Sequence, residues 1–270
     1  MLTDIRALRP DYAAASLRHL WGVMLPAAPR RSLTTVPRRH YTGAAGRGDA
    51  DREAMDRAAR IIPATRLVPV RRRSMNVAPE VFLVALGIVQ QDPHAIVAAL
   101  PSDHLVDHGH RLMQYVARAA AAALVRPDLP IIVATYPGSR DPEYAWVDLG
   151  DNVEGLEAFG VRAVRRLVPR PSPLERAGTL LGTVAIVASG RTLVQLGRRH
   201  LPDVLECLEP LEQVVGRPEE ALLRDAVWES MPRASLCGDL LARVTDLGVL
   251  AMPDAMAGEW SRPELQALAS

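Results

Sequence analysis

Short apolar runs alternate along this chain with longer segments of helical pattern, and this alternation restricts the possible fold more than any other feature. The runs are bounded by proline, glycine or charged residues, which is typical of strands. The candidate strands are Trp21–Leu25, Leu67–Val70, Ala95–Leu100, Pro130–Ala134 and Thr183–Ala188, and the candidate helices are Ala50–Arg60, Ala78–Gln91, Gly109–Arg126, Arg191–Arg199 and Pro218–Trp228. Such a pattern predicts an α/β fold with helices packed on a mostly parallel sheet. Gly109–Arg126 ends before Pro127 and is expected to be a crossover helix between two parallel strands.

One candidate strand ends at a carboxylate. Ile96–Leu100 is wholly apolar, stops at Pro101, and is followed by Ser102 and Asp103. Ligands of open α/β sheets bind beyond the carboxyl ends of the strands, so Asp103 is a candidate ligand for a divalent cation. Aspartate is also a favoured residue at the start of a helix, and a capping role is the alternative interpretation.

Composition excludes several classes of function. The net charge of +1 gives no support to general nucleic-acid binding, and all 32 basic residues are arginine, which excludes any mechanism that depends on lysine. The longest apolar runs are too short to cross a bilayer, and the early charges at Asp4 and Arg6 do not suit a signal peptide. Cys207 and Cys237 lack a metal-type spacing, and Cys237 is expected to be a buried thiol. We therefore expect a cytoplasmic protein with neither membrane nor nucleic acid as partner.

Two further groups of residues have alternative interpretations. His104 and His108 are four positions apart, which on a helix places both on one face, as zinc sites require. Gly109 is expected to interrupt that helix, and no distant ligand is evident, so a transition-metal site is the less favoured interpretation. Arg30–Arg31 and Arg71–Arg73 are suited to gripping phosphates, or equally to forming the solvated face of a loop.

Five short motifs occur in a fixed order along most of residues 21–270. They are Val77-Ala78-Pro79, Leu100-Pro101-Ser102-Asp103-His104, Asp141 to Val147, Val168-Pro169-Arg170-Pro171, and Glu259 to Glu264. Together they resemble the nucleotidyltransferase family of mannose-1-phosphate guanylyltransferases, whose patterns at these points are T-A-P, L-P-S-D-H, P-E-Y-G-W-I, V-E-K-P and D-W-G-T-P-E. The resemblance implies a Rossmann-like three-layer α/β/α nucleotidyltransferase domain over residues 21–270, preceded by a helical extension over residues 1–20.

The resemblance also implies a reaction, in which a sugar 1-phosphate and a nucleoside triphosphate give a sugar nucleotide and pyrophosphate. By this likeness the chain would transfer GMP from GTP to mannose 1-phosphate and form GDP-mannose. The implied catalytic residues are Asp103, Arg31 and Arg170, with Asp103 and Glu259 as ligands of Mg²⁺. The implied nucleotide-binding residues are Ala27, Ala28, Arg30, Ala78 and Pro101, and the implied substrate-binding residues are Glu143, Tyr144, Ala145 and Gly182.

The chain departs from the family where the phosphates should bind. The family loop resembles G-G-x-G-T-R-L-x-P-L, whereas the same register here reads Ala27-Ala28-Pro29-Arg30-Arg31-Ser32-Leu33-Thr34-Thr35-Val36. Glycine permits the close backbone approach that such a loop needs, and a proline lacks the N–H donor. Leu181-Gly182 replaces W-N at the sugar site, and Arg170 replaces a lysine. Two hypotheses follow: an enzyme of reduced activity, or an inactive member that binds a nucleotide or joins an active paralogue as a homo- or hetero-oligomer.

Overall fold

A computed structural model describes residues 15–25, 55–63, 66–69, 77–135, 146–168, 180–214 and 220–252. Its strands are β1 (Leu20–Leu25), β2 (Leu67–Pro69), β3 (Ile96–Pro101), β4 (Ile131–Thr135), β5 (Trp146–Asn152), β6 (Arg162–Val168), β7 (Leu180–Ser189) and β8 (Gly248–Met252). Its longer helices are α3 (Val77–Gln91), α4 (Ser102–Val125), α5 (Gly190–His200), α6 (Pro202–Glu212) and α7 (Glu220–Ser230). All five predicted strands are confirmed. Of the candidate helix Ala50–Arg60, the described part is helical over residues 55–58.

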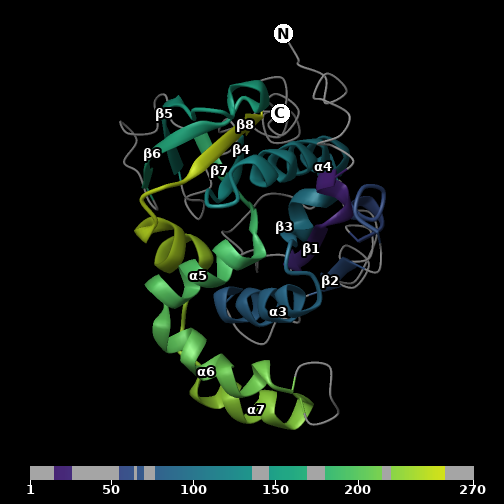
Figure 1. The fold of residues 1–270 in the computed structure, drawn as a ribbon, viewed down its shortest axis with the longest axis vertical. Coiled ribbons are helices and arrows are strands. Elements are labelled where there is room, and N and C mark those ends of the chain that lie inside the picture. The colour runs from purple at the N-terminus through teal and green to yellow at the C-terminus, as the bar shows by residue number, and fades with distance from the viewer. Residues whose placement is uncertain are drawn as a thin grey trace, which may run out of the picture.

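The eight strands form one mixed sheet in the order β2-β1-β3-β7-β4-β8-β6-β5 (Figure 1). The start of β5 also pairs with the start of β7. β1, β2 and β3 are mutually parallel, and so are β4 and β8. β7 lies between β3 and β4 and runs antiparallel to both. The strands β1, β2, β3, β4 and β8 therefore all point the same way, opposite to β7. Most strands of the sheet therefore point the same way, as expected. The sheet is nevertheless mixed, because β7 pairs antiparallel with β3 and β4, and β5 pairs antiparallel with β6.

Helices cover both faces of the sheet, as expected for three α/β/α layers. α4 packs on one face against alternate strand residues such as Ile96, Ala98 and Leu100, and its own contribution is rich in buried alanine, Ala119–Ala123. α3, α5 and α6 pack on the opposite face against the intervening residues, such as Val97 and Ala99. Figure 1 shows α4 and α3 on opposite sides of β1 and β3. This alternation is the period of two of a strand buried on both faces.

The helix after β3 begins earlier than the sequence predicts. α4 starts at Ser102 and continues without interruption through Gly109 to Val125. A glycine inside a helix costs only about 1 kcal/mol relative to alanine, and the alanine-rich remainder of α4 is buried against the sheet. The prediction that Gly109 would interrupt the helix was therefore wrong. The prediction of a crossover was right, because α4 joins β3 to β4 and these strands share a direction.

Most of the predicted helical extension over residues 1–20 lies outside the described residues. Residues 15–18 are helical, and Leu20 already belongs to β1. None of the helices in the described part of the chain has the length and apolar character needed to span a membrane.

Candidate active site at the carboxyl edge

The carboxyl ends of five strands lie along one edge of the sheet, which we call the carboxyl edge. At this edge Leu25 of β1 is in register with Pro101 of β3, and Met24 is in register with Pro69 of β2. Farther along, the last residues of β4 and β8, Thr135 and Met252, are also in register. Parallel α/β sheets bind ligands at this edge, because the connections that leave it are free to form a crevice.

In the half of the carboxyl edge that contains β4 and β8, five residues from five strands pair with one another in a row. Met252 pairs with Thr135, Thr135 with Leu181, Leu181 with Trp146, and Trp146 with Val168. We call these five residues the Thr135 row. It brings together the ends of β8, β4 and β6 and the starts of β7 and β5, although the five residues are spread over more than a hundred positions of sequence.

The structure places Asp103 next to the carboxyl edge. It is the second residue of α4, directly after β3 ends at Pro101. This position lies close to the carboxyl end of β3, as the first interpretation of Asp103 expects. It is inside the first turn of α4 and not at the N-cap, which precedes Ser102, so the capping interpretation does not fit. An acidic residue in a first helical turn is favoured by the helix dipole.

Of the predicted nucleotide-binding residues, the structure describes Ala78 and Pro101, and both belong to the β2-β1-β3 half of this edge. Pro101 ends β3, and Ala78 lies in the first turn of α3, which follows β2 in the chain. Ala78 is fully buried, and its N–H donates a hydrogen bond to the Ala234 carbonyl oxygen, with 3.3 Å between N and O. Its methyl group and N–H are therefore both used within the protein, and a role of Ala78 in nucleotide binding stays a prediction.

Of the predicted substrate-binding residues, the structure describes Gly182, which belongs to the half that carries the Thr135 row. Gly182 lies in β7 and pairs with Ala134 of β4, one position along from the row. Glu143, Tyr144 and Ala145 directly precede Trp146 in the sequence. Among the described residues, those that the resemblance implies for the nucleotide, Ala78 and Pro101, and the one that it implies for the sugar, Gly182, thus belong to different halves of the edge.

Many of the predicted site residues lie outside the described part of the chain. These are Ala27, Ala28, Arg30, Arg31, Glu143, Tyr144, Ala145, Arg170 and Glu259. Each lies in a segment that adjoins the carboxyl edge in the sequence: residues 26–31 follow β1, residues 143–145 precede β5, Arg170 follows β6, and Glu259 is in the segment that follows β8. Their roles stay predictions.

No cluster of three or more metal-ligating side chains occurs among the residues that the structure describes. Cys237 is partly buried, and this burial raises the pKa of its thiol to about 11. A thiol with such a pKa is protonated near neutral pH and is a poor nucleophile.

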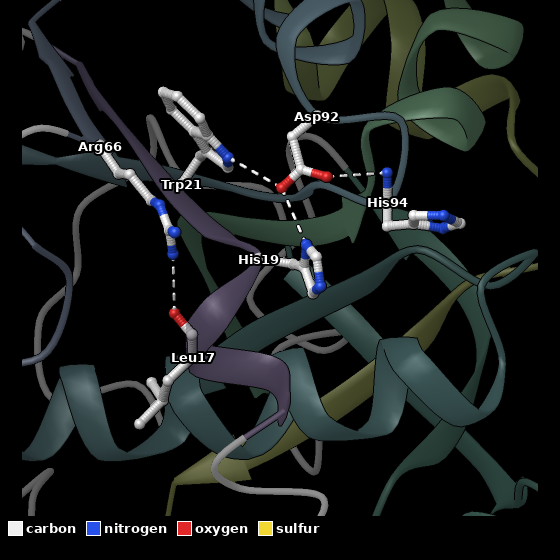
Figure 2. A network of polar contacts seen from close by, with 6 residues as sticks. All are labelled: Leu17, His19, Trp21, Arg66, Asp92 and His94. Carbon is white, nitrogen blue, oxygen red and sulfur yellow. Dashed lines mark hydrogen bonds and ion pairs between the residues drawn. The ribbon is translucent and has the colours of Figure 1, made fainter.

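A cluster of polar contacts lies at the other edge of the sheet, where β1 and β3 begin (Figure 2). Asp92 accepts hydrogen bonds from the His19 ring at 2.9 Å, from the His94 backbone N–H at 3.0 Å, and from Trp21 Nε1 at 3.5 Å. Arg66 stacks over Trp21 and donates to the Leu17 carbonyl oxygen. This cluster could not be predicted from a local sequence motif, because His19 and Asp92 are 73 positions apart.

This cluster is suited to holding the start of β1 against the turn before β3. Burial raises the pKa of the Asp92 carboxyl, but the hydrogen bonds from His19, His94 and Trp21 and the charge of His19 outweigh it, so the pKa lies below the ordinary 3.8. A depressed carboxyl pKa contributes stability above the ordinary pKa, and this contribution is lost as the pH falls through the folded-state value.

Asp92→Asn is therefore expected to lower the free energy of unfolding by about 1–2 kcal/mol at pH 6. The difference from wild type should shrink below pH 3.8, where the carboxyl of wild type also becomes protonated. Urea unfolding at a series of pH values measures both effects. Asp128→Asn is the control, because its ion pair with Arg126 is exposed and contributes less. An equal loss in the two variants would contradict the structural role of Asp92.

Comparison with known proteins relates this geometry to a family. No family model matches the chain. Alginate biosynthesis protein AlgA of Pseudomonas fluorescens is 26% identical over 168 residues, which are 60% of this chain and 34% of AlgA. The chain therefore spans about a third of the length of that curated relative.

Two solved structures have a similar fold. A mannose-1-phosphate geranyltransferase from Thermus thermophilus matches with a TM-score of 0.65 and 18% identity, over 86% of this chain and 74% of that one. These matches agree with the resemblance that the sequence motifs indicate. A mannose-6-phosphate isomerase from Helicobacter pylori matches with a TM-score of 0.62 and 13% identity, over 86% of this chain and 97% of that one. At these identities the structural matches establish the shared fold, which is the family's Rossmann-like α/β fold.

Proposed function

We propose that this chain is a nucleotidyltransferase that transfers GMP from GTP to mannose 1-phosphate, giving GDP-mannose and pyrophosphate. The observation that carries the proposal is the arrangement of the carboxyl edge. Its β2-β1-β3 half adjoins the segments assigned to the nucleotide, and its β4-β7-β8 half adjoins those assigned to the sugar. A transfer between two substrates needs two such adjacent subsites, because the reacting atoms must meet in a near-attack geometry.

In this reaction an oxygen of the sugar phosphate attacks the α-phosphorus of GTP in line with the leaving group. A new P–O bond forms to the sugar phosphate, the bond to the β-phosphate oxygen breaks, and pyrophosphate leaves. Little proton transfer is required, so positioning and charge neutralisation dominate the catalysis. Arg31 would hold the nucleotide phosphates and Arg170 the sugar phosphate, because a guanidinium binds phosphate oxygens in a bidentate manner.

The proposed site suits a magnesium ion. Mg²⁺ prefers carboxylate oxygens and binds nucleotide phosphates through one or two carboxylates, and β3 and α4 position a carboxylate residue, Asp103, at the carboxyl edge. Asp103 and Glu259 would hold the ion. When bound, it would neutralise part of the phosphate charge that builds up during transfer.

One observation favours a second candidate, an inactive member that binds a nucleotide or sugar nucleotide. The segment after β1 contains Ala27, Ala28, Pro29 and Arg30 where the family has a glycine-rich phosphate loop, and the chain contains no lysine. Alanine and arginine hinder the close approach of the backbone to the phosphates, and proline removes a donor.

Pyrophosphate release and calorimetry together separate the two candidates. The first candidate predicts release of pyrophosphate from GTP that requires both mannose 1-phosphate and Mg²⁺. The second predicts a heat of binding with GTP or GDP-mannose, with no pyrophosphate even at high protein concentration. If neither ligand produces heat or a shift in Tm, both candidates are contradicted.

Restoring the glycines should strengthen nucleotide binding. We expect Ala27→Gly, Ala28→Gly and Arg30→Gly combined with Ser32→Arg to lower the Kd for GTP about tenfold, because backbone N–H groups gain access to the phosphates. Titration calorimetry with Mg²⁺ measures the change. Ala44→Gly, Ala45→Gly, Arg47→Gly and Thr42→Arg make the same change of composition further along the chain and serve as the control. If the Kd for GTP of the variant with restored glycines is unchanged, residues 27–32 do not bind the phosphates of GTP.

A further inference from the structure

Thr135 has a buried hydroxyl whose hydrogen-bonding capacity the protein does not use. The residue is 1% exposed, and its Oγ1 has no hydrogen-bond partner. It ends β4, a strand whose other residues, Ile131–Ala134, are apolar and buried. A buried hydroxyl without a partner costs free energy, and most such groups in folded proteins are paired.

The position of Thr135 at the carboxyl edge indicates where a partner would come from. Thr135 is a member of the Thr135 row, in which it pairs with Met252 on one side and with Leu181 on the other. It lies in the half of the edge that adjoins the segments assigned to the sugar. Thr135 is the last residue of β4, so it stands at the carboxyl edge, whereas the apolar residues Ile131–Ala134 precede it in the strand.

The face on which Thr135 lies agrees with this placement. Side chains alternate along a strand, and Ile131 and Val133 belong to the core cluster beneath α4. Thr135 therefore shares the α4 face, as does Met252 opposite it. α4 begins at the carboxyl edge, and its first turn contains Asp103. Thr135 and the proposed metal ligand Asp103 thus belong to the same edge and the same face of the sheet. β7 lies between β4, which ends at Thr135, and β3, which precedes α4.

We infer that the Thr135 hydroxyl is a positioning group for the sugar, forming a hydrogen bond to a hydroxyl of the bound sugar 1-phosphate or sugar nucleotide. This inference rests on the proposed function, which supplies the ligand class. A hydroxyl both donates and accepts, which suits a sugar hydroxyl, whereas arginine suits the phosphates. The nucleotide, at the other half of the edge, does not contact Thr135.

The test compares GDP-mannose with GDP as probes, by titration calorimetry on the full chain. Thr135→Val, which keeps the shape of the side chain and removes the hydroxyl, is expected to weaken GDP-mannose binding about tenfold. The Kd for GDP should change less than about twofold, because GDP lacks the sugar. Thr135→Ser keeps the hydroxyl and should retain most of the affinity for GDP-mannose.

A stability measurement excludes a merely structural role. Thr135→Val removes an unpaired hydroxyl from a buried place, so Tm should stay the same or rise. Thr192→Val is the control, because the Thr192 hydroxyl donates to the Pro127 carbonyl oxygen. That variant should lower Tm and leave the binding of GDP-mannose unchanged.

Two results would overturn the inference while leaving the proposed function intact. They are equal binding of GDP-mannose by wild type and Thr135→Val, and an equal loss of GDP and GDP-mannose binding in that variant. Failure of wild type to bind either probe would instead overturn the proposed function, and the inference with it.

Discussion

Asp103→Asn is expected to weaken the Mg²⁺-dependent binding of GTP by at least about a hundredfold, and to reduce any pyrophosphate release by a similar factor. A metal ion contributes several kcal/mol to phosphoryl chemistry, and an amide is a poorer ligand for Mg²⁺ than a carboxylate. Asp103 stands directly after β3, where the sheet presents its carboxyl edge. Calorimetric titration of GTP with and without Mg²⁺ measures the loss.

The fold supplies a closely matched control for this variant. Asp203 is also the second residue of a helix, α6, and it is exposed. Asp203→Asn removes the same charge from the same helical position and should leave GTP binding unchanged. If Asp103→Asn and Asp203→Asn behave alike, Asp103 holds no metal, and the proposed site is wrong.

Phe82→Ala is expected to lower the free energy of unfolding by about 3–5 kcal/mol, the largest loss of stability that we predict. Phe82 lies in the middle of α3, is 0% exposed, and belongs to the core cluster under α3, α5 and α6. A Cβ at Gly197 of α5 would lie 2.7 Å from a ring carbon of Phe82, so the ring packs directly on the α5 backbone. Urea unfolding at neutral pH measures the change.

A double-mutant cycle with Gly197 tests this contact. Alone, Gly197→Ala should destabilise the protein by about 1–3 kcal/mol, because the new methyl group overlaps Phe82 and Leu205. In the Phe82→Ala background the methyl group enters the space left by the ring, so the same change should be neutral or stabilising. Additive effects of the two substitutions would contradict the direct packing of Phe82 on α5.

The elements with a strong local signal could be predicted from the sequence. β1, β3 and β4 are almost wholly apolar and are buried on both faces, so a short apolar run sufficed. β6 has the sequence Arg162-Ala163-Val164-Arg165-Arg166-Leu167-Val168. Its three arginines interrupt the apolar pattern, so the sequence did not predict this strand. It is a strand because β5 and β8 provide hydrogen-bonding partners on its two sides, and those partners are distant in sequence.

The candidate site divides in the same way. Asp103 could be found because a strand, a proline and an acidic residue are adjacent in the chain. Thr135 gave no such signal, since a threonine at the end of an apolar strand is ordinary. Its significance follows from the lack of a partner for its hydroxyl and from its pairing with Met252 and Leu181.

The sequence by itself determined the α/β class, the five apolar strands, the crossover between β3 and β4, and the motifs of the family. These properties depend on periodicity and on residues that are neighbours in the chain, so local physics specifies them. Only the tertiary structure decided that β7 is inserted antiparallel between β3 and β4, and that His19 hydrogen-bonds to Asp92. It also decided that the ends of β8, β4 and β6 and the starts of β7 and β5 meet in the Thr135 row. Such features depend on pairing between distant segments, whose backbone hydrogen bonds are nearly independent of side-chain identity, and the sequence therefore carries little local record of them.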